Sequence, residues 1–150
     1  MNSRKRMLRW ASGIMIVLGA GHLSVVVLTG WAQVADWARR GLWAAVPFFG
    51  AGGDAVQPLE TLRDKAVFWA GPGSFAVPLI LLGCLTWHLA GRGVAVPAGI
   101  GWGVAVWSVL GGVLLVPSPF FAGAVAGTLI VLAARKEDRP GRNGLETPQA

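Results

Sequence analysis

The side chains best suited to bind a metal or transfer a proton near neutral pH are two histidines, His22 and His88, and one cysteine, Cys84. His22 lies inside the apolar run LGAGHLSVVVLTG, residues 18–30. An ionisable group in such a run costs free energy unless it finds a partner, so it is a candidate ligand or proton site. The alternative is a neutral imidazole that hydrogen-bonds a neighbouring helix and fixes its orientation.

A shared site for both histidines is not expected. His22 is 12 residues beyond Trp10, which corresponds to about 18 Å along a helix. His88 instead lies beside Trp87, at the end of another apolar stretch. The single cysteine excludes an intrachain disulfide and a CxxC metal site. Without HExxH, paired intramembrane carboxylates or a serine–histidine arrangement, we predict no catalytic residue, no metal and no cofactor.

The segment FWAGPGSFAVP, residues 68–78, is the other place where the sequence suggests a site. Pro78 lacks a backbone donor and clashes with the carbonyl of Ser74, which predicts a helix kink. Pro72, between two glycines, is a second weak point. A pocket lined by His22, Ser74 and Pro78 could hold a small molecule, a quinone or a lipid. A packed kink without a cavity is the alternative.

Composition indicates which elements position these residues. The chain has 150 residues, of which 54% are hydrophobic and 13% charged, and its mean hydropathy is +0.58. A water-soluble domain of this size needs more charge to cover its surface. Backbone groups in lipid must be paired internally, which favours helices. We therefore predict an all-α, four-span membrane bundle, residues 10–135, with spans near 10–30, 66–90, 97–116 and 119–134.

Basic residues predict the orientation of these spans. One side has nine basic and three acidic residues. It comprises residues 1–9, the loop at Arg92, and the tail 136–150 with the adjoining Arg135. The other side has four of each. The excess of Lys and Arg on the first side predicts that both termini lie in the cytoplasm. Because the basic residues cluster at the ends of apolar segments and not along one polar face, we do not expect nucleic-acid binding. The alternative is a signal peptide cleaved near AQVA, residues 32–35.

The outer connection, residues 31–63, begins with a segment of helical periodicity. Trp31 and Leu42 fall on its apolar side, whereas Asp36 and Arg40 fall opposite. This pattern is typical of a helix in the membrane interface, although a lid packed on the bundle has the same pattern. A loop is expected at 48–57, and Pro58 with Glu60 predicts a new helix start. The tail 136–150 is polar and is predicted to be disordered.

Small residues recur at helical spacing in the third and fourth spans. One row of the third span contains Gly99, Gly103 and Gly111, and a second contains Gly101, Ala105, Ser108 and Gly112. The fourth contains Gly123 and Gly127. Such rows let helices approach closely, and a turn around Ser118 would make the two spans antiparallel neighbours. Our leading hypothesis is a non-enzymatic protein that contacts membrane lipids and packs against itself or another membrane subunit.

Two motifs carry a resemblance to a known family. SGIMIVLGAGHL and KAVFWAGPGSFAVPLILLGCL resemble the first and second helices of a family of small bacterial membrane proteins, the domain-of-unknown-function family 6463. The similarity covers about residues 10–134, and AGPG departs from the family's usual pattern. The resemblance implies a four-helix protein of the bacterial cytoplasmic membrane and supplies no activity.

Overall fold

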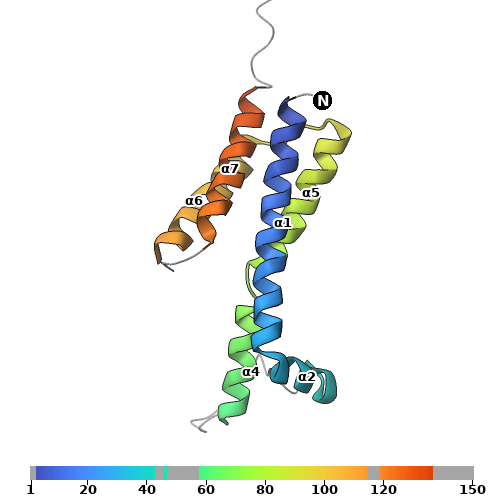
Figure 1. Ribbon diagram of the computed structural model, residues 1–150, viewed down its shortest axis with the longest axis vertical. Helices are drawn as coiled ribbons and strands as arrows, with labels where there is room; N and C mark the ends of the chain where they lie inside the picture. The colour runs from blue at the N-terminus through green and yellow to red at the C-terminus, as the bar shows by residue number, and fades with distance from the viewer. Residues whose placement is uncertain (1–2, 43–45, 47–57, 115–118, 137–150) are drawn as a thin grey trace, which may run out of the picture. The chain divides into compact units, whose positions relative to one another are not determined.

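The computed structural model describes residues 3–42, 46, 58–114 and 119–136, which contain helices and no strand. Six helices follow one another in this part of the chain (Figure 1): α1 Ser3–Thr29, α2 Trp31–Arg40, α4 Leu59–Ala70, α5 Ala76–Arg92, α6 Ala98–Leu114 and α7 Phe120–Arg135. The prediction of an all-α chain is confirmed for these residues. The expected loop at 48–57, the turn at Ser118 and residues 137–150 of the expected tail lie outside them.

One described helix, α1, is long and apolar enough to cross a bilayer by length and composition. It has 27 residues, and its most apolar window has a mean hydropathy of 2.0. Helices α5 and α6 have 17 residues each and α7 has 16. A span needs about 20 residues and at the least about 17, so these three lie at or just below the lower limit.

The second apolar stretch, predicted as one span over 66–90, is divided into two helices. Helix α4 begins immediately after Pro58, as predicted, and ends at Ala70. Helix α5 begins at Ala76, so residues 71–75 separate the two. The expected kink at Pro78 is therefore wrong, because the chain leaves the helical conformation several residues earlier, around the Gly-Pro-Gly sequence at 71–73.

The chain divides into two compact units, one formed by Met1–Leu18 with Leu81–Ala150 and the other by Gly19–Ile80. In the first unit, α6 and α7 pack against each other with their backbones in contact. A Cβ added at Gly127 would lie 2.5 Å from both the Ala105 nitrogen and the Gly101 oxygen. Ser108 faces Gly123 in the same way. As the residue number increases along α6, the residue number of its contact on α7 decreases, so the two helices are antiparallel.

Of the two small-residue rows on α6, one forms this contact. Gly101, Ser108 and Gly112 are buried. At Gly99 and Gly103 an added Cβ would meet nothing within 4 Å. The predicted tight packing of these helices is confirmed for the row that contains Gly101, whereas Gly99 and Gly103 of the other row lie on an open side.

Glycines also bring α1 close to its neighbours within each unit. In the first unit, a Cβ at Gly83 of α5 would lie 2.8 Å from Ile16 and 3.1 Å from the Ser12 oxygen. In the second unit, a Cβ at Gly19 would lie 2.8 Å from the Ala76 oxygen. Helical spacing places Ser12, Met15 and Gly19 on one face of α1, and all three are buried. His22, on the same face, is exposed.

Candidate functional site

The connection between α4 and α5 is held by hydrogen bonds within its own backbone and to Ser74. The Gly73 nitrogen donates to the Phe68 oxygen at 2.8 Å, and the Ser74 nitrogen donates to the Gly71 oxygen at 2.9 Å. The Ser74 hydroxyl donates to the Gly71 oxygen at 2.6 Å and accepts a hydrogen bond from the Ala76 nitrogen at 3.2 Å. Ser74 therefore closes the turn and satisfies a free backbone donor at the start of α5.

His22 contacts this connection from α1. Its Nε2 lies 2.7 Å from the carbonyl oxygen of Ala70, the last residue of α4. A carbonyl oxygen only accepts, so Nε2 carries the proton and donates it to the hydrogen bond. The last four carbonyls of a helix have no donor within the helix, and His22 supplies one from another helix. The ring of Phe75 lies beside the imidazole, with centroids 5.9 Å apart.

Pro78 does not act as a kink in the middle of a helix. It is the third residue of α5, within the first turn, where a backbone donor has no intrahelical partner. The structure thus places His22 and Ser74 on the same helix break, each bonded to a backbone carbonyl, and it places Pro78 at the start of the next helix. The imidazole and hydroxyl hold the backbone together at this point, which is the structural role weighed for His22.

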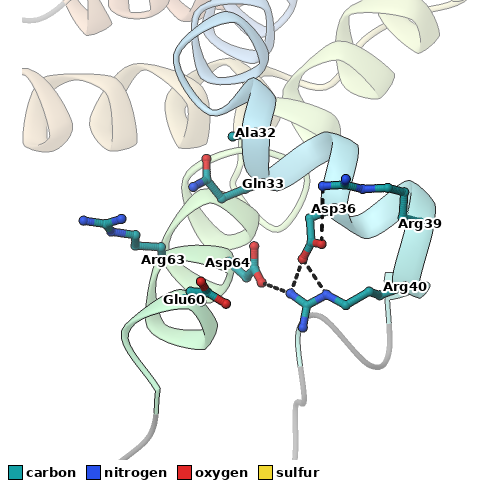
Figure 2. Close-up of a pocket in the computed structure, with 8 residues that line it drawn as sticks. All are labelled: Ala32, Gln33, Asp36, Arg39, Arg40, Glu60, Arg63 and Asp64. Atoms are coloured by element: carbon teal, nitrogen blue, oxygen red, sulfur yellow. Dashed lines mark hydrogen bonds and ion pairs between the residues drawn. The ribbon is translucent and has the colours of Figure 1, made fainter.

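A charged pocket lies between α2 and α4, and the sequence analysis did not anticipate it (Figure 2). Its volume is about 240 Å³, and its lining includes three carboxylates and three guanidinium groups. The lining residues are Ala32, Gln33, Asp36, Arg39, Arg40, Glu60, Arg63 and Asp64. Its charged side chains come from two different helices, α2 and α4.

Arg40 joins the two helices across this pocket. Its Nε lies 2.6 Å from Asp36 Oδ2, and its guanidinium Nη2 also contacts Asp36. The same Nη2 donates to Asp64 Oδ2 at 2.9 Å. Figure 2 shows the guanidinium between the two carboxylates, with Arg63 directed away from it. The Asp64 side chain is only 4% exposed, so Arg40 neutralises a carboxylate that is withdrawn from solvent. We call Asp36, Arg40 and Asp64 the charged clasp.

The electrostatics of the clasp keep Arg40 positively charged. Its hydrogen bond to Asp36 raises the pKa of Arg40, and the charges of Asp36, Asp64 and Glu60 raise it further against a smaller opposing effect of desolvation. Arg39 is more weakly held, since its guanidinium lies 3.8 Å from Asp36 and its side chain is 76% exposed. Asp64 is therefore held through Arg40, whereas Arg39 lies at the rim.

An aromatic contact accompanies the clasp. The rings of Trp37 on α2 and Phe68 on α4 meet edge to face, with centroids 6.2 Å apart. The polar side of α2 thus faces α4, because Trp37 and Arg40 both contact that helix. The apolar residues Trp31 and Leu42 are exposed.

The clasp contains no nucleophile and no histidine, and its carboxylates are paired with arginine. No group of three or more His, Cys, Asp or Glu side chains suited to a metal ion occurs within the described ranges. The helical wheel gave the signal for one half of the clasp, since Asp36 and Arg40 share a face. It could not identify Asp64 as their partner.

Comparison with known proteins gives a family and no relative of known activity. A family of unknown function (DUF6463) matches residues 6–137. No curated protein and no solved structure matches the chain. The match covers both helices that contain the quoted motifs, the charged clasp and the helix break, so the chain belongs to the DUF6463 family.

Proposed function

We propose that this chain is an integral membrane protein whose four spans are α1, the α4–α5 pair, α6 and α7, with both termini in the cytoplasm. It catalyses no reaction and works by packing against a second copy of itself or another membrane subunit. The observation that carries the proposal is the large apolar surface that the described helices leave uncovered.

Helix α6 shows this surface most clearly. Six of its large apolar side chains are between 53% and 78% exposed, namely Trp102, Val106, Trp107, Leu110, Val113 and Leu114. A monomeric soluble protein rarely exposes a continuous apolar patch of this kind. In a bilayer the same side chains contact lipid tails or a neighbouring helix at no cost in hydration.

The arrangement of α2 supports a membrane interface beside the second unit. The charged clasp holds its polar side against α4, and Trp31 and Leu42 remain available to lipid. A short helix with an apolar side and tryptophans at its edge is typical of the headgroup region. Because α2 has only 10 residues, it needs such tertiary or lipid contacts to remain helical.

The open glycines of α6 support packing with another helix. Gly99 and Gly103 lie one turn apart, and an added Cβ at either position would meet nothing within 4 Å. Small residues one turn apart let a second helix approach closely. The alternative function, binding of a quinone or other small molecule near His22, has weaker support because His22 and Ser74 already bond to backbone carbonyls.

Two experiments test the membrane placement. The protein should remain in the membrane pellet after alkaline carbonate extraction, and a cytoplasm-active reporter fused to its C-terminus should be active. Release into the supernatant would overturn the membrane proposal. A reporter active only on the outer side would overturn the orientation alone.

A third experiment tests self-association. Gly103→Leu should lower the fraction of crosslinked dimer in lipid vesicles, since leucine fills the open side of α6. Gly21→Leu is the matched control, because Gly21 on α1 is equally open. A chain that crosslinks only as a monomer and retrieves no other membrane subunit would contradict the packing role.

A further inference from the structure

In the first unit, three helix ends meet with their basic residues together. Lys136, just after α7, donates from Nζ to the hydroxyl of Ser3 at the start of α1, at 3.2 Å. The Arg9 guanidinium lies 5.5 Å from the centre of the Trp87 ring near the end of α5. Figure 1 shows these three helix ends at the same end of the unit. The contacts therefore gather residues that are far apart in the sequence.

The side chains at this end are almost all cationic. Seven described residues contribute to it: Arg4, Lys5, Arg6, Arg9, Arg92, Arg135 and Lys136. Five of these, Arg6, Arg9, Arg92, Arg135 and Lys136, are exposed. No Asp or Glu occurs in the described part of this unit. The sequence of residues 137–150 adds two basic and three acidic residues, so the excess of positive charge remains. We call these seven residues the basic end.

The basic end also has the aromatic residues of a headgroup region. Trp10 is 68% exposed and Trp87 is 49% exposed. Indole rings favour the depth at which lipid headgroups meet the hydrocarbon. Arginine guanidinium groups suit phosphate oxygens because they can donate two parallel hydrogen bonds. The basic end therefore combines guanidinium groups and indole rings, the two kinds of side chain that suit the depth of the lipid phosphates in a bilayer.

We propose that the basic end binds the phosphate groups of anionic phospholipids, so that the protein selects these lipids over zwitterionic ones. The inference rests on the proposed membrane placement and adds a partner to it. Arg6 and Arg135 are the central residues, because they are exposed arginines on two different helices. Each cation near an anionic surface contributes about fivefold to the partitioning of a basic segment.

The test uses the full chain in bicelles of equal phosphatidylglycerol and phosphatidylcholine. Native mass spectrometry then counts the lipids of each class that stay bound. We expect phosphatidylglycerol to exceed phosphatidylcholine severalfold, and the double variant Arg6→Gln, Arg135→Gln to lower this ratio. Raising the salt concentration to 1 M should have the same effect, since it shortens the screening length to about 3 Å.

The matched control removes the same amount of charge from the second unit. Arg39→Gln with Arg63→Gln replaces two exposed arginines on α2 and α4 and should keep the preference. Equal retention of both lipids by the unchanged protein would overturn the inference, as would an equal loss in the two double variants. Insertion is checked separately by carbonate extraction, so an inserted protein without lipid preference contradicts the basic end and leaves the membrane proposal standing.

Discussion

His22 and Ala70 are 48 residues apart in the sequence, and a 2.7 Å hydrogen bond joins the imidazole of one to the carbonyl oxygen of the other. The bond links α1 to the last residue of α4 at the point where the second apolar stretch is interrupted. A helix that ends in an apolar environment leaves carbonyl groups without donors. His22 satisfies one of them, which explains why an apolar helix contains a histidine at this position.

Replacing His22 by phenylalanine should therefore destabilise the protein without unfolding it. The expected loss is roughly 0.6–2 kcal/mol, the range for hydrogen bonds between helices in membranes. Equilibrium unfolding in mixed detergent micelles measures it. Ser24→Ala is the control on the same helix, because the Ser24 hydroxyl bonds only to Ala20 of its own helix. Equal stability of His22→Phe and the unchanged protein would show that the bond contributes nothing.

The helix break should depend on Ser74 and not on Pro78. Ser74→Ala removes both hydroxyl hydrogen bonds and should cost about 1 kcal/mol, the usual value for losing a helix-capping side chain. Pro78→Ala should change stability by less than about 0.5 kcal/mol, because the proline occupies the first turn of α5. The distance between spin labels at Leu62 and Leu85 reports the angle of the break. A longer distance between the labels in Pro78→Ala would show that the proline causes the bend between α4 and α5.

The contact between α6 and α7 predicts opposite effects for two glycine substitutions. Gly127→Ala should destabilise the protein by about 1–3 kcal/mol, because the new methyl group overlaps the backbone of α6. Gly103→Ala should be neutral or stabilising by up to about 1 kcal/mol, since alanine favours helix and meets no neighbour. Thermal unfolding in detergent compares the two. A similar loss of stability in both variants would show that the row of Gly103, and not only that of Gly101, contacts another helix.

The charged clasp predicts that Asp64 holds α2 in place. Asp64→Asn should leave Arg40 paired with Asp36 alone and weaken the attachment of α2 to α4. Backbone hydrogen exchange over residues 31–40 should then approach that of an isolated ten-residue helix, which is marginal in water. Arg39→Gln is the control, since Arg39 is exposed and only distantly paired. Unchanged exchange in Asp64→Asn would show that other contacts hold α2.

The sequence was sufficient to predict helices and the near-contact of the last two, because hydrophobic period and small-residue spacing are local signals. It could not choose between the two glycine rows of α6, since both have helical spacing, whereas in the structure Gly101 faces α7 and Gly99 and Gly103 do not. It located two weak points in the second stretch, a kink at Pro78 and the Pro72 site between two glycines, and the helix breaks at the second of these. Gly71 and Ser74 determine the break through hydrogen bonds that a pattern of residue types does not contain.

The charged clasp could not be predicted from the sequence for a similar reason. Asp36 and Arg40 lie on one face of a short helix, and periodicity predicts that face to be polar and solvated. Asp64 lies 24 residues beyond Arg40 and becomes buried only when α4 packs beside α2. Likewise, the sequence placed His22 inside an apolar run without naming its partner, whereas in the structure the ring is exposed and Nε2 bonds to the Ala70 carbonyl.

The close approach of Gly101 and Gly127 has a consequence for assembly. Two helices that meet through main-chain atoms immobilise almost no side-chain rotamers when they associate, so their pairing loses little conformational entropy. The last two helices should therefore join early in assembly, before contacts that depend on ordering long side chains, and they should be the last part of the chain to separate on heating.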